Sequence, residues 1–203
     1  EYEKALCNLM RHQILYPCSC SRKDIEMAAT APQEDALRFG QEGRIYPGTC
    51  RNKSMHSIKE GEAIRLNIAA AVARLKDPLM YVETKNGTKN EKYFQSETLV
   101  KNSGDVVLRR RQSGDIAYHL CVVVDDAAQN ITDVVRGEDL EEATQIHVLL
   151  QQLLQLKTPN YHHHRLIRDE KGKRLAKRTD AKSIKSFREN GASPCDIRRI
   201  VGL

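Results

Sequence analysis

Apolar side chains recur at helical spacing over the first residues of the chain. They give residues 2–15 one apolar face, which predicts an amphipathic helix that ends at the Tyr16-Pro17 step. This face is formed by Leu6, Leu9, Met10 and Ile14. Ser21 and Asp24 then have the spacing of a capping pair, which predicts a second helix to about residue 31.

The middle of the chain carries short alternating segments instead. Residues 63–68 alternate apolar and polar side chains, as a half-buried strand does, and residues 105–110 are expected to form another strand. Asn86-Gly87 is typical of a tight hairpin turn. The stretch before these strands is rich in Gly and Pro and has no clean period. We therefore predict a small β-rich module over residues 16–115.

Strands and helices alternate in the second half. Residues 117–128 are apolar enough for a strand or a buried helix, and periodicity does not decide between them. Further strands are expected at 131–135 and 161–167, and further helices from Glu138, over 184–190 and from Ser193-Pro194. This alternation predicts an α/β layer.

Composition narrows the class of protein. The 203 residues are 40% hydrophobic and 30% charged, which is typical of a soluble globular chain. The longest apolar stretches, such as residues 120–124, fall far short of the roughly 18 to 20 residues that a membrane span needs. The net charge of +6 is compatible with an RNA partner, and equally with a solvated basic face.

Three of the six cysteines lie around a loop-rich stretch. Cys18, Cys20 and Cys50 could bring three thiolates to one zinc ion, and a fourth ligand would be needed. The side chains close enough in sequence to supply it are those of His12, His56 and Tyr46. The alternative is three ordinary thiols.

Two basic features are candidates for binding anions. The loop at residues 171–178 carries two basic clusters that suit a polyphosphate, although an exposed hairpin tip is the simpler interpretation. Arg136 follows a buried-looking strand, where it could clamp a carboxylate or form a salt bridge with Asp125, Glu138 or Asp139. In His162-His163-His164, alternate residues of a strand face opposite ways, so this tract is interpreted as structural or nucleotide-contacting and not as one metal site.

An ordered series of segments resembles the glutamyl-tRNA synthetase group of class I aminoacyl-tRNA synthetases. Residues 115–127 are a valine-rich run that ends in Asp-Asp-Ala, residues 134–140 read Val-Val-Arg-Gly-Glu-Asp-Leu, and residues 172–178 contain a lysine signature loop. Ala127, Leu140 and the Tyr46-Pro-Gly-Thr-Cys50 spacing resemble the short glutamyl-Q branch of that group. The resemblance covers essentially the whole chain.

The resemblance implies an α/β Rossmann-type catalytic domain with an inserted zinc-containing subdomain. Residues 1–15 would be a helix of the catalytic domain, 16–115 the inserted zinc-binding, β-rich subdomain, and 116–203 the second half of the catalytic domain. The first strand–helix unit and the histidine signature would precede Glu1 in a longer protein, without which the given sequence should be inactive.

The resemblance also implies an activity and its residues. The enzyme would activate L-glutamate with ATP and Mg²⁺, then transfer it to queuosine in the anticodon loop of tRNA(Asp), as a cytoplasmic monomer. Tyr118 and Arg136 would bind glutamate, and Arg174 and Lys177 would bind ATP, with Lys177 catalytic. A structural zinc ion would be bound by Cys18, Cys20, Tyr46 and Cys50. One departure from the family pattern is Ala176, which stands where the signature has a serine.

Two alternatives stay open at the level of sequence. The chain could be a fragment of an ordinary glutamyl-tRNA synthetase that charges tRNA(Glu). It could also be a zinc-stapled RNA-binding module without catalytic activity. Glutamate-dependent exchange between ATP and pyrophosphate is expected of either kind of synthetase and would exclude the non-catalytic RNA-binding module.

Overall fold

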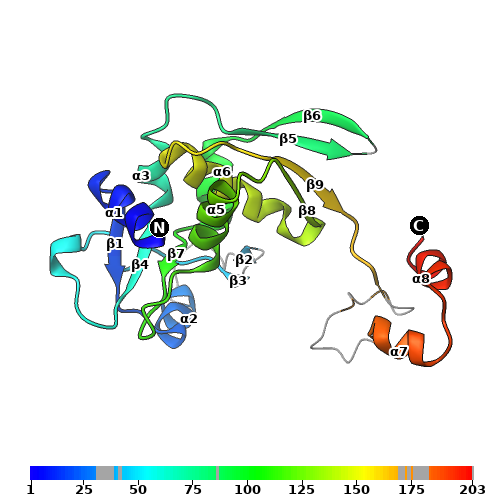
Figure 1. Ribbon diagram of the computed structural model, residues 1–203. Helices are drawn as coiled ribbons and strands as arrows, with labels where there is room; N and C mark the ends of the chain where they lie inside the picture. Colours follow the sequence, from blue (N-terminus) through cyan, green and yellow to red (C-terminus); the bar gives the residue numbers. More distant parts are fainter. Residues whose placement is uncertain are drawn as a thin grey trace. The chain divides into compact units, whose positions relative to one another are not determined.

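The chain divides into two compact units, Glu1–His163 and His164–Leu203, which are described separately (Figure 1). The structure is a computed structural model that describes residues 1–30, 39–40, 43–85, 87–168, 172, 175 and 183–202. The α/β class expected from the sequence is confirmed, because the first unit combines three sheets with packed helices.

A three-stranded antiparallel sheet lies near the start of the first unit. Its order is β1-β4-β7, and its strands are β1 (Leu15–Cys18), β4 (Ala63–Leu66) and β7 (Val107–Arg109). All four residues of β1 and of β4 are buried, including Arg65. The half-buried strand expected over residues 63–68 is therefore wrong in its exposure, because Arg65 is buried with its apolar neighbours. Pro17 is tolerated in β1 because an edge strand has one side without ladder hydrogen bonds.

The first helix is shorter than its apolar pattern predicts. Helix α1 (Tyr2–Arg11) ends before Gln13, whose φ of 55° reverses the chain. Ile14 and Leu15 therefore bury their side chains from a loop and from strand β1. The prediction of a helix to residue 15 is wrong at its end because an apolar residue fits either element, and periodicity does not detect the left-handed residue between them.

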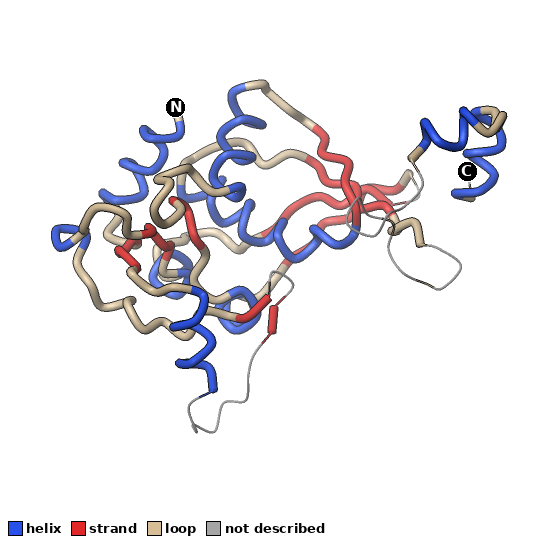
Figure 2. Tube along the Cα trace, turned by 90° about the horizontal axis from the view of Figure 1, so that it is seen from below, coloured by secondary structure: helices blue, strands red, loops and turns tan. Residues whose placement is uncertain are grey.

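A four-stranded sheet joins the middle of the chain to its second half (Figure 2). Its order is β6-β5-β9-β8, and its strands are β5 (Met80–Lys85), β6 (Thr88–Tyr93), β8 (Asp133–Gly137) and β9 (Asn160–His164). The predicted hairpin is confirmed, since Lys85 pairs with Thr88 across the two-residue turn. Strand β5 runs parallel to β9, with Glu83 opposite Tyr161.

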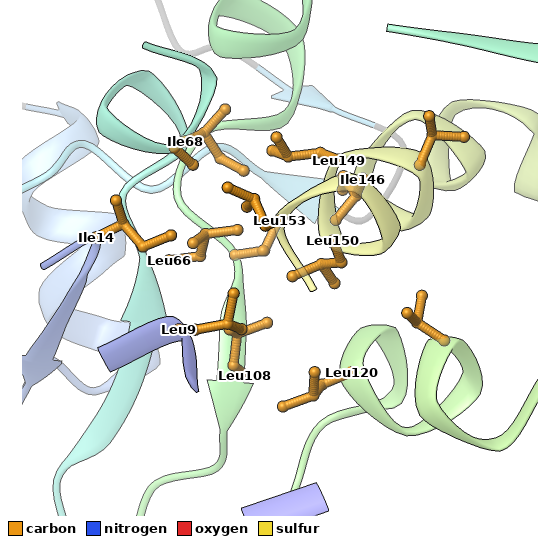
Figure 3. Packing of buried hydrophobic residues seen from close by; sticks show 14 of the residues in the cluster. Leu9, Ile14, Leu66, Ile68, Leu108, Leu120, Ile146, Leu149, Leu150 and Leu153 are labelled. Atoms are coloured by element: carbon orange, nitrogen blue, oxygen red, sulfur yellow. The ribbon is translucent and has the colours of Figure 1, made fainter. Parts of the chain in front are cut away.

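Two long helices pack against each other in the second half of this unit. They are α5 (Tyr118–Ala128) and α6 (Glu141–Leu153), which follows the short 3-10 turn η2 (Glu138–Leu140). The segment that could have been a strand or a helix is thus a helix. Figure 3 shows Leu9 of α1, Leu66 of β4, Leu108 of β7, Leu120 of α5 and Leu149 of α6 meeting in one core.

The remaining elements of the first unit connect these layers. They are α2 (Arg22–Thr30), β2 (Phe39–Gly40), β3 (Gly43–Arg44), the 3-10 turn η1 (Met55–Ser57), α3 (Ile68–Val72) and α4 (Ser96–Ser103). The predicted cap of α2 is confirmed, because Ser21 and Asp24 exchange hydrogen bonds.

The second unit contains two short helices, α7 (Ile184–Glu189) and α8 (Pro194–Val201). Helix α8 begins as its sequence predicts. Ser193 accepts a hydrogen bond from the amide of Asp196, whose carboxylate accepts one from the amide of Ser193, and Pro194 occupies the first turn. The Arg165 guanidinium donates to the carbonyl of Val201 at the other end of the helix.

Candidate functional site

A cavity of about 880 Å³ lies in the first unit. Its walls come from the turn after β1, from β4, and from the first turns of α5 and α6. The lining includes Cys20, Tyr46, Arg65, Arg110, Tyr118 and Glu142. The cavity therefore borders both the cysteine cluster and one of the two predicted glutamate ligands.

Tyr118 is the first residue of α5 and borders this cavity. Its side chain is 45% exposed, so the phenol is accessible to a ligand. The ring lies 5.7 Å from the ring of His147, in an edge-to-face arrangement that fixes its orientation.

Arg136 lies near the end of β8 and is held by three hydrogen bonds. Nε donates to Nε2 of His163 over 3.3 Å, Nη1 donates to Nδ1 of His147 over 3.2 Å, and Nη2 donates to the Thr144 hydroxyl. Tyr118 and Arg136 therefore both contact His147. The structure brings the two predicted glutamate ligands to the same residue.

His147 links Arg136 to a second buried histidine. It lies on α6, and its Nε2 is 3.1 Å from Nδ1 of His119 on α5. Burial, followed by the charges of His119 and Arg136, holds the pKa of His147 well below its usual value. His147 is thus neutral at physiological pH, as an acceptor of the Arg136 hydrogen bond must be.

Each histidine of the tract at the end of β9 contacts a different protein group. His162 Nδ1 lies 2.6 Å from the carbonyl oxygen of Thr84, whereas His163 contacts the buried carboxylate of Glu83. His164 contacts the carbonyl of Arg165. Of the three, His163 belongs to the surroundings of Arg136.

Sequence reasoning missed most of the residues around Arg136. They are Glu83, His119, Thr144 and His147. A usable signal was present in α6, where Thr144, His147 and Gln151 recur at helical spacing among apolar residues and are all buried. Polar side chains on the core face of a helix need partners, so this stripe indicated a buried polar site.

The three cysteines predicted to bind metal lie together. The sulfur atoms of Cys18, Cys20 and Cys50 are within 4.8 Å of one another. The Tyr46 hydroxyl is 3.4 Å from the Cys18 sulfur and 3.5 Å from the Cys20 sulfur. In the part of the chain that the structure describes, the group of metal-ligating side chains contains these three cysteines and no histidine.

The spacing of these atoms fits a tetrahedral zinc ion. Zinc–sulfur bonds of about 2.3 Å and zinc–oxygen bonds of about 2.0 Å would place two sulfurs about 3.8 Å apart, and a sulfur and an oxygen about 3.5 Å apart. The Cys20 and Cys50 sulfurs are 3.6 Å apart, and both Tyr46 distances match the second value. These three distances therefore fit tetrahedral zinc coordination.

The surroundings of Cys50 favour the anionic, thiolate form of its side chain. Burial acts to raise the pKa of the Cys50 thiol, but hydrogen bonds from Tyr46, Ser19 and Cys20 outweigh it and lower this pKa to about 6. Burial raises the pKa of Tyr46, so a metal that binds it as a phenolate must displace a proton.

The loop that carries Tyr46 is tied to the three-stranded sheet. Asp105 accepts hydrogen bonds from the Tyr16 hydroxyl and from Nε of Arg51, and Arg65 stacks over the Tyr46 ring at 3.9 Å. Gly104 has a φ of 60°, and a Cβ atom there would lie 2.5 Å from the Ile45 side chain. The glycine therefore lets this loop approach closely.

The predicted ATP-binding residues Arg174 and Lys177, together with Ala176, lie outside the described residues. Their roles stay predictions.

The fold and the sites can now be compared with known proteins. Residues 1–203 match the family of class I tRNA synthetases (E and Q), catalytic domain. The chain belongs to this family. Its resemblance to that group is thereby confirmed across the whole chain.

Among curated relatives, the chain is 48% identical over 209 residues to the glutamyl-Q tRNA(Asp) synthetase of Rhodobacter capsulatus, which it covers to 72%. It is 38% identical over 214 residues to the glutamyl-Q tRNA(Asp) synthetase of Albidiferax ferrireducens, which it covers to 67%. Both alignments include 100% of this chain.

Solved structures support the fold independently. A glutamate-tRNA synthetase from Elizabethkingia anophelis aligns with a TM-score of 0.60 at 19% identity, covering 94% of this chain and 36% of that one. Within the described ranges, no helix combines the length and the apolar character that crossing a bilayer requires.

Proposed function

We propose that the protein activates L-glutamate with ATP and transfers the glutamyl group to queuosine in the anticodon loop of tRNA(Asp). The observation that carries this proposal is the 48% identity to a glutamyl-Q tRNA(Asp) synthetase over the whole chain. The meeting of Tyr118 and Arg136 at His147 supports it, because an arginine can bind a glutamate carboxylate and Tyr118 offers an accessible hydroxyl.

In the first step, an oxygen of the glutamate α-carboxylate attacks the α-phosphorus of ATP. A bond from that phosphorus to the carboxylate oxygen forms, the bond to the bridging oxygen of the β-phosphate breaks, and pyrophosphate leaves. Arg136 and Tyr118 orient the amino acid, while Lys177 and Arg174 neutralise the phosphates. Positioning and charge stabilisation supply most of the rate in such a transfer.

In the second step, a hydroxyl oxygen of the queuosine cyclopentenediol attacks the carbonyl carbon of glutamyl-adenylate. The new ester bond forms, the bond to phosphate breaks, AMP leaves, and the hydroxyl proton passes to solvent. Exposed arginine side chains in the lining of the cavity, such as Arg110 and Arg111, suit a phosphate-bearing partner.

We further propose that Cys18, Cys20, Tyr46 and Cys50 bind one structural zinc ion, which would hold the loop after β1 against the loop at residues 45–50. The match of the sulfur and oxygen spacing to tetrahedral coordination supports this assignment. We also propose that the inserted subdomain has its boundaries at residues 15 and 115, and that the protein is a cytoplasmic monomer.

A charging assay tests the proposed function. Full-length protein is incubated with ATP, labelled glutamate, and tRNA(Asp) that either carries or lacks queuosine. We expect label only on the modified tRNA, retained in the anticodon fragment after nuclease digestion. Label on unmodified tRNA, or on the 3′ adenosine, would contradict the proposal and indicate an ordinary glutamyl-tRNA synthetase.

A further inference from the structure

The hydrogen bonds around Arg136 form a continuous buried network that extends well beyond the predicted ligands. We infer that Thr144, His147, His163 and Glu83 are positioning residues, which hold the Arg136 guanidinium in the orientation that binds the substrate carboxylate. This inference rests on the proposed role of Arg136 in glutamate binding. It adds an explanation of how the arginine is oriented before the substrate arrives.

The direction of the network follows from chemistry, because a guanidinium only donates hydrogen bonds. Nδ1 of His147 must accept from Arg136, which leaves the ring proton on Nε2. That nitrogen then donates to Nδ1 of His119. One arginine thus fixes the tautomers of two buried rings.

A buried carboxylate fixes the third ring from the opposite side. Glu83, which is 3% exposed, accepts from the backbone amide of His163 over 2.9 Å and from its Nδ1 over 2.8 Å. The His163 proton therefore lies on Nδ1, and Nε2 is free to accept from Nε of Arg136. The ring is also stacked on that of Tyr161, at an interplanar angle of 1°.

Thr144 is the third residue that accepts a hydrogen bond from the Arg136 guanidinium. Its hydroxyl accepts from Nη2 of Arg136 and donates to the carbonyl of Leu140 over 3.1 Å, so its position is set by the start of α6. The same oxygen lies 3.0 Å from Nε2 of His163. Thr144 and His163 are consequently in contact with each other as well as with the arginine.

These contacts leave the guanidinium with a defined binding edge. It has five N–H donors, of which the described residues occupy one on each nitrogen. One N–H on Nη1 and one on Nη2 remain for a ligand, and a guanidinium binds a carboxylate through such N–H groups. An arginine already fixed in this way loses less conformational entropy when the ligand binds.

A purely structural role explains this arrangement less well. Burying Glu83 and two histidine rings costs free energy, and an apolar core of the same volume would be at least as stable. All four positioning residues are instead connected to the one arginine beside Tyr118. Such a cluster is expected where a side chain must be oriented for a ligand.

The test compares variants of the full-length protein in glutamate-dependent exchange between ATP and pyrophosphate. Thr144→Val removes the hydroxyl and keeps the shape, whereas Thr144→Ser keeps the hydroxyl. We expect Thr144→Val to raise the KM for glutamate roughly tenfold or more, the scale of one hydrogen bond to a charged group, and to leave the KM for ATP within about twofold. Thr144→Ser should restore the wild-type value.

Glu83→Gln provides a second variant of almost unchanged size. The amide oxygen of the glutamine can accept only one of the two hydrogen bonds from His163. The amide nitrogen then faces the other His163 nitrogen with an N–H group. If Nδ1 of His163 becomes the acceptor, the ring proton moves to Nε2 and opposes the N–H of Arg136. We expect the same selective rise in the KM for glutamate, and this variant carries the test if Thr144→Val does not fold.

Gln152→Met is the matched control, because Gln152 is a polar residue of the same helix whose side chain donates to the carbonyl of Pro78 and to none of the residues around Arg136. It should leave the KM for glutamate unchanged. An equal rise in all three variants, or no rise in Thr144→Val and Glu83→Gln, would overturn the inference. A wild-type protein without exchange activity would instead refute the proposed function.

Discussion

Arg136 shows what can be expected of a single residue and what requires the fold. The sequence pattern placed Arg136 at the end of a strand, as a carboxylate clamp or a salt-bridge partner, and the structure has it near the end of β8. The strand is not buried as its valine pair suggested, because Val135 is 68% exposed. The partners of Arg136 come from β9 and α6, and behind them stands a carboxylate from β5. No local pattern connects residues so distant in sequence, so the carboxylate clamp and the salt bridge could not be separated from sequence alone.

At the same scale, Lys177 is expected to stabilise the charge that develops on the ATP phosphates. We predict that Lys177→Ala lowers the rate of glutamate activation roughly 10²-fold, the scale of one lost transition-state contact. Pyrophosphate exchange by the full-length variant measures this. Lys185→Ala, which changes an exposed lysine of α7, should exchange like the wild type. Unchanged exchange by Lys177→Ala would refute the proposed role.

At the scale of elements, local chemistry predicted the boundaries that depend on caps and turns. The caps of α2 and α8 and the turn of the β5–β6 hairpin involve residues no more than three positions apart. The helix end where the prediction is wrong and the segment that periodicity does not decide both depend on tertiary packing. An example is α5, whose apolar run suits a buried helix as well as a strand, and which becomes a helix that packs on α6.

The cap of α8 allows a direct test. We predict that Ser193→Ala removes the hydrogen bond to the amide of Asp196 and destabilises the helix by about 1 kcal/mol. Amide hydrogen exchange should be faster in residues 194–201 and unchanged in α5. Ser193→Asp keeps a capping oxygen and should retain wild-type protection. Equal protection in Ser193→Ala and Ser193→Asp would show that the cap contributes nothing measurable.

At the scale of the whole molecule, the cysteine cluster connects segments that the sequence keeps apart. Cys18 ends β1 and Cys20 lies in the turn after it, whereas Tyr46 and Cys50 lie about thirty residues later in a loop tied to Asp105. The sequence predicted which cysteines meet, because their clustering was visible. Spacing alone left three possible fourth ligands and the family resemblance implied Tyr46, and the structure places the Tyr46 phenol beside the sulfurs.

We predict that Cys50→Ser abolishes zinc binding, while Cys195→Ser retains it. The first change removes one of the clustered sulfurs, whereas Cys195 is an exposed residue of α8 in the other unit. Elemental analysis of the purified proteins should give about one zinc per chain for the wild type and Cys195→Ser, and almost none for Cys50→Ser. Equal metal content in both variants would overturn the ligand assignment.

The pairing of Glu83 with His163 also constrains the order in which the protein forms during synthesis. The two residues are 80 positions apart, so a ribosome that adds roughly 5 to 20 residues per second needs roughly 4 to 16 seconds to produce the partner. A carboxylate enclosed without its partner is strongly disfavoured. The β5–β6 hairpin should therefore stay open to water during this interval, and the nascent chain then offers a chaperone an unfinished sheet to bind.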